Sequence, residues 1–267
     1  MNPRTRFAPT PSGFLHLGNA VHLATLSSAA ELFGWELFLR VDDLDSVRVQ
    51  AEYIDDIFDM LRWLDIAVTE GPVDAAQLHS TWSQQRRMES YVNARDALMD
   101  SDAPVYVCGC SRKLWQTHAG DGCPGGCMDL ELTTGVNSLR MRQTHGADVV
   151  VWRREGLPAF HLASVVDDHV WGVTHVVRGA DLIESTRVQR EIAQWLPGNA
   201  FTQMVVVHHD LILDRHGHKL SKSSGAGAEP LQRTAEMRQE IERLSQDLLA
   251  KVQPNVSEID STPKSGR

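Results

Sequence analysis

The segment Arg6-Phe-Ala-Pro-Thr-Pro-Ser-Gly-Phe-Leu-His-Leu-Gly-Asn19 joins a short extended stretch to a run of small and apolar residues. Within it, the serine and glycine at positions 12 and 13 predict a turn. The small and apolar residues continue to Phe33, and Gly34 is a typical helix stop, so residues 17–33 are predicted to form a helix. Residues 36–41 predict a second strand. The first forty residues therefore predict a βαβ unit.

Further elements follow from periodicity. An amphipathic helix is predicted over residues 48–65, where apolar side chains recur at helical spacing, and Asp55 and Asp56 fall on its predicted solvated face. Another helix is predicted over residues 82–99. Short strands are predicted over residues 138–141 and 149–152.

The tetrapeptide His16-Leu-Gly18-Asn19 lies where the predicted turn meets the predicted helix. Gly18 allows the backbone to approach a phosphate closely, and the first turn of a helix presents free N–H groups to an anion. His16 can donate a hydrogen bond to a developing oxyanion. Taken alone, a histidine at a helix start is more often a solvated cap. The tetrapeptide therefore needs a second motif to indicate phosphate chemistry.

That second motif is Lys219-Leu-Ser221-Lys222-Ser223, about two hundred residues later in the chain. Two lysines flanked by serines and glycine suit a loop over a triphosphate, because ammonium groups neutralise the α-phosphorus oxygens and the departing pyrophosphate. The alternative interpretation is a solvated surface turn. The combination with residues 6–19 favours the phosphate role.

Together these segments resemble the two signatures of the class I aminoacyl-tRNA synthetases, and in particular the glutamate branch. Two further stretches carry the same resemblance, residues 39–48 and residues 159–181, so that it covers about residues 4–225. It implies an α/β fold with a Rossmann-type ATP site and an enzyme that forms an aminoacyl-adenylate. The implied catalytic residues are His16, Asn19, Lys219 and Lys222, and the implied ATP-binding residues are the same four together with Gly18 and Ser221.

The resemblance also implies a pocket for the amino acid, lined by Arg6, Phe7, Ala8, Pro9, Thr10, Asp42, Phe160 and Arg178. Two arginines suit a dicarboxylic substrate, since each guanidinium can bind a carboxylate through two hydrogen bonds. The alternatives are a structural pairing of Arg178 with Asp168 or Asp181 and a surface position for Arg6.

Two positions of this pocket depart from the family. Asp42 stands where the family has a glutamate that holds the substrate ammonium, and its side chain is one methylene shorter. Phe160 stands where the family has a tyrosine, so a hydroxyl and its hydrogen bond are missing. The resemblance therefore favours glutamate as the substrate and leaves another amino acid open.

All four cysteines of the chain, Cys108, Cys110, Cys123 and Cys127, lie within twenty consecutive residues. Two pairs, C-x-C and C-x3-C, are separated by twelve residues and offer four thiolates, which suits a tetrahedral structural zinc site. In the related enzymes a tyrosine often occupies the place of Cys123, so the resemblance implies a site with four sulfur ligands here. His118 as a substitute ligand and four reduced cysteines without a metal are the alternatives.

Composition divides the chain further. Residues 1–100 and 157–225 are predicted to be the two halves of the catalytic domain, and residues 101–156, rich in glycine and cysteine, an inserted zinc-binding subdomain on the acceptor side. A C-terminal helix is predicted over residues 226–253. The polar residues 254–267 contain two prolines and are predicted to be disordered.

Forty-four residues follow Ser223, which we expect to be too few for the anticodon-binding region of a full glutamyl-tRNA synthetase. The chain thus resembles the truncated paralogues of that enzyme, which activate glutamate without tRNA and attach it to the queuosine base of tRNA(Asp). The implied partners are ATP, L-glutamate and queuosine-containing tRNA(Asp), and the implied cofactors are structural Zn²⁺ and Mg²⁺ with ATP. Two other classes stay open: a ligase for another amino acid or a non-tRNA acceptor, and a non-catalytic protein that binds tRNA or an amino acid.

The overall composition is that of an ordinary globular protein, with 42% hydrophobic and 23% charged residues among 267. No apolar run approaches the ~20 residues of a membrane-spanning helix, and the N-terminus lacks the apolar core of a secretion signal. We therefore expect a cytoplasmic monomer without a membrane partner. The 26 basic and 35 acidic residues give a net charge of −9, which argues against non-specific coating of nucleic acid and permits a local basic surface.

Overall fold

The structure is a computed structural model that describes residues 2–45, 47–118, 122–198, 200–212 and 229–261. The chain divides into two compact units. The first comprises Met1–Arg86, Val173–Ile183 and Met204–Arg267, and the second comprises Arg87–Gly172 and Glu184–Gln203. The segment predicted as an insertion, residues 101–156, belongs wholly to the second unit, which also contains helices on either side of it.

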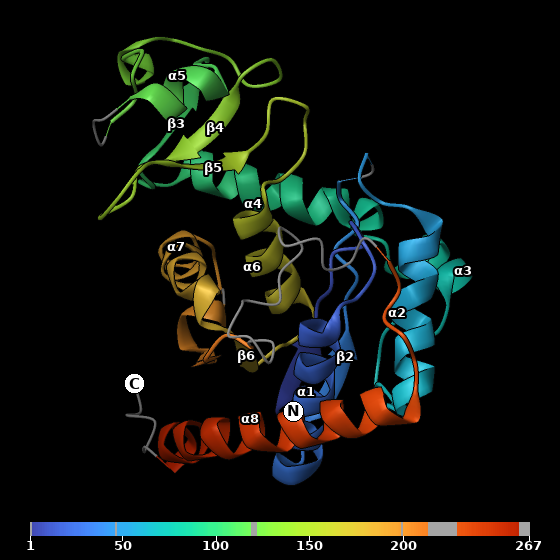
Figure 1. Cartoon of the computed structure of the whole chain (residues 1–267). Helices are drawn as coiled ribbons and strands as arrows, with labels where there is room; N and C mark the ends of the chain where they lie inside the picture. Colours follow the sequence, from blue (N-terminus) through green and yellow to red (C-terminus); the bar gives the residue numbers. More distant parts are fainter. Residues whose placement is uncertain (1, 46, 119–121, 199, 213–228, 262–267) are drawn as a thin grey trace. The chain divides into compact units, whose positions relative to one another are not determined.

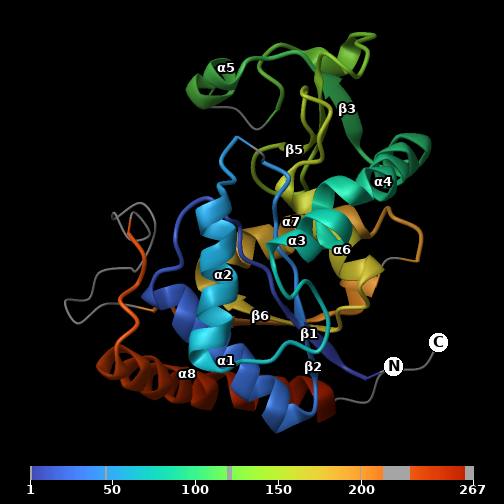
Figure 2. The same cartoon turned by 90° about the vertical axis from the view of Figure 1, so that its right-hand side faces the viewer.

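The first unit is built on parallel β-strands (Figures 1 and 2). β1 (Arg4–Phe7) pairs with β2 (Glu36–Leu39), and β6 (His175–Gly179) pairs with β7 (Val205–His209). β1 also lies beside β6, since the N–H of Thr174 donates to the carbonyl of Arg4 at 2.9 Å. β1–β2 and β6–β7 each form a two-stranded parallel sheet, and the strands follow in space in the order β2-β1-β6-β7, as around the switch point of a doubly wound fold.

α1 (Leu17–Phe33) connects β1 to β2 and confirms the predicted helix. The helix buries small and apolar residues around much of its circumference, as expected for a helix enclosed in a core. It ends at Gly34, whose backbone is left-handed (φ 67°) and whose N–H donates to the carbonyl of Ala30. This geometry explains why a glycine stands at that position.

α2 (Ala51–Leu64) confirms the predicted amphipathic helix, and its apolar side packs into the core of the first unit. The prediction that Asp55 and Asp56 share a solvated face is wrong for one of them. Asp55 is exposed, whereas Asp56 is only 4% exposed and has partners inside the unit. After α2 the chain forms α3 (Ala75–Gln77), a π-helical turn (Leu78–Trp82), and a 3-10 turn (Gln84–Arg87).

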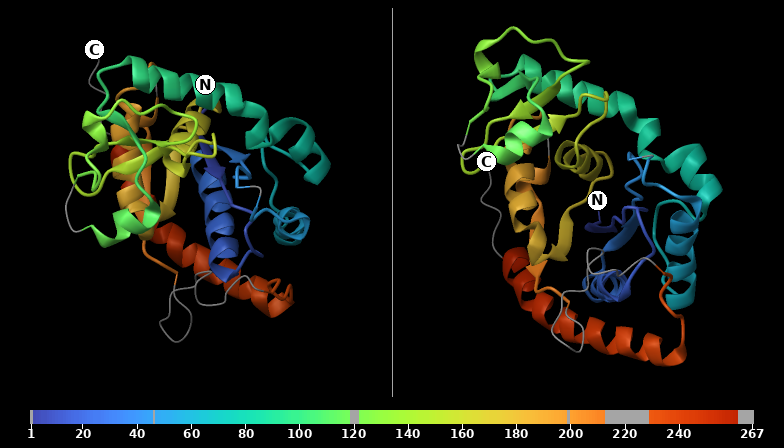
Figure 3. Two further views of the ribbon diagram at one scale, coloured as in Figure 1. Left: turned by 90° about the horizontal axis from the view of Figure 1, so that it is seen from above. Right: turned by 45° about the horizontal axis from the view of Figure 1, so that its top comes forward.

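α8 (Ala235–Ser261) packs against α1 (Figure 3). The prediction that residues 254–267 are disordered is wrong for residues 254–261, because the helix continues through Pro254. A proline inside a helix removes one backbone hydrogen bond and is costly. Val252 and Val256, on either side of it, are 1% and 0% exposed in the core of the first unit, and their burial offsets part of that cost.

The second unit combines helices with a small antiparallel sheet. The sheet has the order β3-β4-β5, from β3 (Val105–Cys108), β4 (Ser138–Met141) and β5 (Val149–Trp152), so the two short strands predicted from the sequence are confirmed. The helices are α4 (Met88–Asp100), α5 (Arg112–Thr117), α6 (Phe160–Val170) and α7 (Ile183–Ala193), with 3-10 turns at Cys127–Asp129 and Ala200–Gln203. A further 3-10 turn, Ala180–Leu182, follows β6 in the first unit. α4 begins six residues later than the helix predicted over residues 82–99.

A buried carboxylate joins α4 to α6 within the second unit. Asp167, which is fully buried, accepts hydrogen bonds from Nε of Arg87 at 3.0 Å and from the hydroxyl of Tyr91 at 2.7 Å. A buried charge is tolerated only when it is paired and hydrogen-bonded, so these contacts fix the two helices against each other. None of the helices in the described part of the chain has the length and apolar character needed to cross a membrane.

Candidate functional site

His16 is the residue at which α1 begins. Its backbone is extended (φ −96°, ψ 173°), and its N–H donates to Oδ1 of Asn19 at 3.2 Å. Asn19 therefore shapes the turn into the helix, and Gly18 is buried in that first turn. The structure brings His16, Gly18 and Asn19 together at the helix start. Their binding to ATP stays a prediction.

The predicted second phosphate motif cannot be placed in the same way. Lys219, Ser221 and Lys222 lie outside the described residues. Their role rests on the sequence alone.

Most residues predicted for the amino-acid pocket belong to the first unit. Arg6 and Phe7 lie on β1, Asp42 follows β2, and Arg178 lies on β6 next to β1. Phe160 is different, because it begins α6 in the second unit and its surface is 47% exposed.

The pairing of β1 with β2 continues beyond both strands. The N–H of Arg40 donates to the carbonyl of Phe7, and the N–H of Asp42 donates to the carbonyl of Pro9, both at 2.9 Å. This extended pairing places the predicted segment Phe7–Thr10 alongside Asp42. The two motifs that supply these residues are thus brought side by side by backbone hydrogen bonds.

Asp42 is held by a neighbouring arginine that sequence reasoning did not single out. Nε of Arg40 donates to Oδ1 of Asp42 at 2.7 Å, and Nη2 of Arg40 donates to Oδ2 at 3.2 Å. The Arg40 side chain is 3% exposed and the Asp42 side chain 11%. Such a two-point contact fixes the plane of the carboxylate and offsets its charge. The i, i+2 spacing of the two residues on an extended chain was the available signal, because it puts both side chains on one face.

A glutamine adds a third contact to this carboxylate. Nε2 of Gln84 lies 3.4 Å from Oδ1 of Asp42, its backbone N–H donates to Oδ1 of Asp43 at 2.8 Å, and its Oε1 accepts from the N–H of Leu44 at 3.2 Å. Gln84 is 2% exposed. No pattern in the sequence pointed to it, since it lies forty-two residues away in a short 3-10 turn.

Arg6 and Arg178 are buried, at 7% and 4% exposure, on the neighbouring strands β1 and β6. A guanidinium stays charged even when it is buried. Arg6 directly precedes the Phe7–Thr10 segment, and Arg178 lies on the neighbouring strand; their binding to a negatively charged ligand stays a prediction. The burial of Arg6 excludes the surface position that was considered for it.

A pair of histidines joins α1 to β7 in the first unit. Nδ1 of His22 lies 3.3 Å from Nε2 of His209, and Nδ1 of His209 contacts the carbonyl of Asp210 at 2.7 Å. Burial, with contributions from the charges of His209 and Arg6, lowers the pKa of His22 to about 3. Burial also lowers the pKa of His209, so both imidazoles are neutral near pH 7 and His209 makes ordinary hydrogen bonds.

The four cysteines gather in the second unit with their sulfur atoms within 4.8 Å of one another. Sγ of Cys123 lies 3.7 Å from that of Cys108 and 3.6 Å from that of Cys110, and Cys110 and Cys127 are 3.5 Å apart. A disulfide requires about 2.05 Å. Four sulfurs at about 2.3 Å from a central zinc ion are separated from one another by roughly 3.8 Å. The cluster thus has nearly the spacing of a tetrahedral zinc site, and it does not include His118.

The backbone around the cysteines supports this arrangement. A side chain at Gly125 would bring its Cβ within 2.7 Å of Sγ of Cys110, so only glycine permits the close approach. Burial opposes ionisation of Cys123, but hydrogen bonds from the N–H groups of Cys127 and Gly125 and from the thiols of Cys110 and Cys127 together lower the pKa of its thiol to about 7. Donors that stabilise a thiolate favour metal binding, because the thiolate is the ligand.

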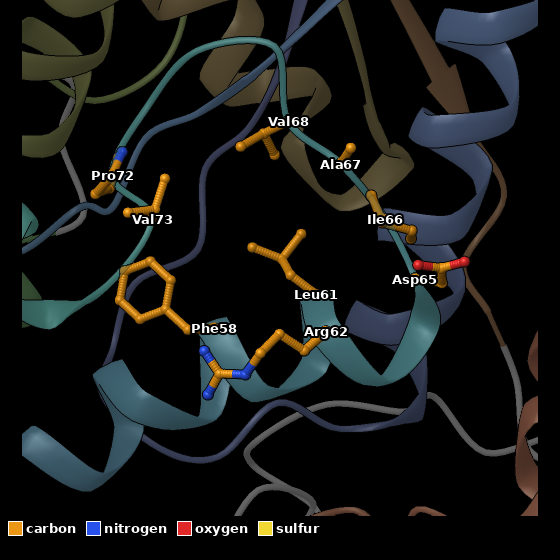
Figure 4. A pocket seen from close by; sticks show the side chains of 9 residues that line it. All are labelled: Phe58, Leu61, Arg62, Asp65, Ile66, Ala67, Val68, Pro72 and Val73. Carbon is orange, nitrogen blue, oxygen red and sulfur yellow. The ribbon is translucent and has the colours of Figure 1, made fainter.

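Figure 4 shows a pocket at the C-terminal end of α2, with a volume of about 430 Å³. It is lined by Phe58, Leu61, Arg62, Asp65, Ile66, Ala67, Val68, Pro72 and Val73. None of the residues predicted to bind ATP, an amino acid or a metal is among them. The pocket therefore contributes nothing to the candidate site.

Residues 3–119 and 134–239 match the family model of the tRNA synthetases class I (E and Q), catalytic domain. The chain belongs to this family. The match includes the helix start at His16, the Phe7–Thr10 segment, Asp42, Arg178 and the Lys219–Ser223 motif. The expectation drawn from those motifs is thereby confirmed at the level of the family, whose members are ligases.

Two curated members of this synthetase family match the chain over most of its length. The chain is 33% identical over 255 residues to the glutamyl-Q tRNA(Asp) synthetase of Nitratidesulfovibrio vulgaris, covering 82% of the chain and 77% of the relative. It is 34% identical over 261 residues to the protein of the same name from Symbiobacterium thermophilum, covering 83% and 78%. The chain is thus similar to these proteins over most of both lengths.

Solved structures of the synthetase family support the fold. The glutamate-tRNA synthetase of Elizabethkingia anophelis matches with a TM-score of 0.67 and 22% identity, over 84% of the chain and 53% of that synthetase. The chain spans about half the length of this solved relative. The α/β fold of a class I catalytic domain, predicted from the two signatures, is confirmed.

Proposed function

We propose that this class I synthetase-family protein activates L-glutamate with ATP, without tRNA, and transfers the glutamyl group to the queuosine base of tRNA(Asp). The observation that carries the first half is the pair of buried arginines, Arg6 and Arg178, on strands that flank the segment leading to His16. The second half is supported by the names of the relatives that match over most of the chain.

In the proposed adenylation, an oxygen of the substrate α-carboxylate attacks the α-phosphorus of ATP and the bond to the bridging oxygen of pyrophosphate breaks. His16 and the first turn of α1 would stabilise the charge on the α-phosphate. Lys219 and Lys222 would neutralise the departing pyrophosphate, and Mg²⁺ bound to ATP would offset the charge of its phosphates. No protein nucleophile is required, because positioning and charge stabilisation suffice.

Selection of glutamate would depend on Arg6 and Arg178, each suited to a carboxylate. The substrate ammonium would meet the carboxylate of Asp42, whose plane is fixed by Arg40. In the second unit, Cys108, Cys110, Cys123 and Cys127 would hold a structural zinc ion that stabilises the turns around β3.

The first test is amino-acid-dependent exchange of pyrophosphate into ATP in the absence of tRNA, with each of the twenty amino acids. We expect glutamate to support exchange. Glutamine is the matched control, since it has nearly the same shape without the side-chain charge, and we expect it to be at least tenfold less active because it loses a charge-assisted pair. Exchange with another amino acid and none with glutamate would contradict the substrate assignment.

One observation favours a second candidate, a ligase of the same family for a different amino acid. Asp42 is one methylene shorter than the family's glutamate, and Arg40 and Gln84 both contact its carboxylate. A substrate whose ammonium sits nearer the backbone of β2 would suit this shorter reach. The same exchange experiment distinguishes the two candidates.

The second test concerns the acceptor. Three preparations of tRNA(Asp) are compared with labelled glutamate: one containing queuosine, the same tRNA without its 3′-terminal adenosine, and an unmodified transcript. We expect the first two to be charged equally and the transcript to remain uncharged, with charging weakened by salt as phosphate contacts are screened. Equal charging of the transcript would exclude the modified base as acceptor.

A further inference from the structure

Asp56 is a buried carboxylate on α2 that no step of the proposed chemistry uses. It is 4% exposed, although its neighbour Asp55 faces solvent. Burial raises the pKa of Asp56, against the opposing influence of its partners Leu15 and Arg233. Burying a carboxylate removes its hydration, and the free-energy cost is offset only when the group is hydrogen-bonded or paired with a positive charge.

The first of these contacts reaches the nucleotide-binding segment. Oδ2 of Asp56 accepts a hydrogen bond from the backbone N–H of Leu15 at 2.7 Å, across forty-one residues of sequence. Leu15 is 2% exposed and immediately precedes His16, the cap of α1. Its N–H lies before the helix and is buried, so it requires an acceptor from outside the helix.

The second contact comes from the other end of the chain. Nη2 of Arg233 donates to Oδ1 of Asp56 and lies 3.4 Å from the Asp56 backbone carbonyl. Nη1 of the same arginine lies 3.6 Å from Asp59. Arg233 is two residues before α8 and ten residues after Ser223 in the sequence. The Asp56 carboxylate thus joins the backbone immediately before the His16–Asn19 tetrapeptide to the chain that follows the Lys219–Ser223 motif.

We infer that Asp56 is a positioning residue for nucleotide binding, which holds Leu15 so that His16 and the first turn of α1 face the phosphates of ATP. Arg233 supplies a counter-charge that favours the ionised form of Asp56 and orients its carboxylate. The kinetic test of this inference rests on the proposed function. The second test, the Kd of ATP, requires only that the protein binds ATP. Asp56 does not touch the substrates in this scheme and acts only through the backbone of Leu15.

The consequences of losing this acceptor follow from the burial of Leu15. Without Asp56, the Leu15 N–H would be buried and unpaired, and the segment before His16 would shift to find another acceptor. A shift of about 1 Å in a group that binds the reacting phosphates can cost on the order of a hundredfold in rate. The amino-acid pocket is built by other residues, so its affinity for glutamate should change little.

The experiment compares four single variants of the full chain. Asp56→Leu removes both contacts, Asp56→Asn keeps an acceptor for Leu15 and loses the charge, and Arg233→Gln removes only the counter-charge. Asp55→Leu is the matched control at the exposed neighbour. For each we measure kcat and the KM values for ATP and glutamate in pyrophosphate exchange, the Kd of ATP by calorimetry, and the unfolding midpoint in urea.

For Asp56→Leu we expect the KM and Kd of ATP to rise at least about tenfold while the KM of glutamate stays within about twofold. Asp56→Asn should stay within about threefold of the original protein in ATP affinity, because Leu15 keeps its acceptor, and Arg233→Gln should fall between the two. Asp55→Leu should leave all values unchanged. If Asp56→Leu does not fold, Asp56→Ala takes its place in the same comparison.

Two results would overturn the inference. One is a loss of stability in Asp56→Leu with unchanged ATP affinity in the folded protein, which indicates a purely structural role. The other is an equal weakening of ATP and glutamate. A failure of the proposed function is distinguishable, because it shows as absent exchange in the original protein, and the Kd of ATP then decides the inference without any catalytic step.

Discussion

Removing zinc from the purified protein is expected to unfold the turns around β3 in the second unit and to abolish their protection from hydrogen exchange. Four sulfur atoms with nearly the spacing of a tetrahedral ZnS₄ centre provide the ligands. The small apolar cluster there consists of Tyr106, Cys108 and Cys127 with a few partly buried neighbours. Such a cluster buries little surface, whereas structural zinc contributes on the order of 10 kcal/mol in zinc-finger peptides.

This expectation is checked by elemental analysis and hydrogen exchange on protein prepared under reducing conditions. We expect about one zinc per chain. Cys123→Ala should lose most of the metal, because three ligands remain of the four. Leu130→Ala, an exposed substitution three residues after Cys127 (54% exposed), is the control and should keep both metal and protection. A folded second unit that contains no zinc would contradict the metal site.

Lys222→Ala is expected to lower kcat of pyrophosphate exchange by about a hundredfold or more and to leave the unfolding midpoint unchanged. The ammonium group is predicted to act on charge that develops as pyrophosphate departs, so its loss raises the barrier more than it weakens ground-state binding. The prediction rests on the spacing of the motif and on the family match, which includes residue 222.

The control for this variant is Lys251→Ala. Lys251 lies on α8 with its side chain 66% exposed and its Nζ 3.9 Å from Asp210. An ion pair this exposed contributes little to stability, so kcat should be unchanged. An exchange rate in Lys222→Ala equal to that of the control would show that residues 219–223 are not the catalytic loop.

Elements whose signal is local were predicted well from the sequence. α1 and its glycine stop, α2, and the strands β4 and β5 all lie where periodicity or composition placed them. The clustering of four cysteines within twenty residues likewise predicted the group that the fold assembles. These features depend on neighbours a few residues apart, which is the range over which helix and strand patterns operate.

Errors arose where a distant partner overrides a local pattern. Pro254 and the polar residues around it predicted a disordered tail. Val252 and Val256 are instead buried in the core of the first unit, and the helix continues to Ser261. Asp56 has the local pattern of a solvated residue, and its burial is explained by two distant partners, the N–H of Leu15, 41 residues away, and Arg233, 177 residues away. Composition alone does not contain such pairings.

The sequence by itself therefore determined the family, the βαβ start and the clustering of the four cysteines, because each depends on residue types at fixed short spacing. The phosphate role of the two motifs stays a prediction. Tertiary structure decided that Arg40 and Gln84 hold Asp42, that Phe7–Thr10 runs beside it, and that Asp56 supports the residue before His16. These contacts join segments far apart in the chain. Their physical reason is that buried charges and buried backbone N–H groups must find partners, and the folded chain decides which groups are close enough.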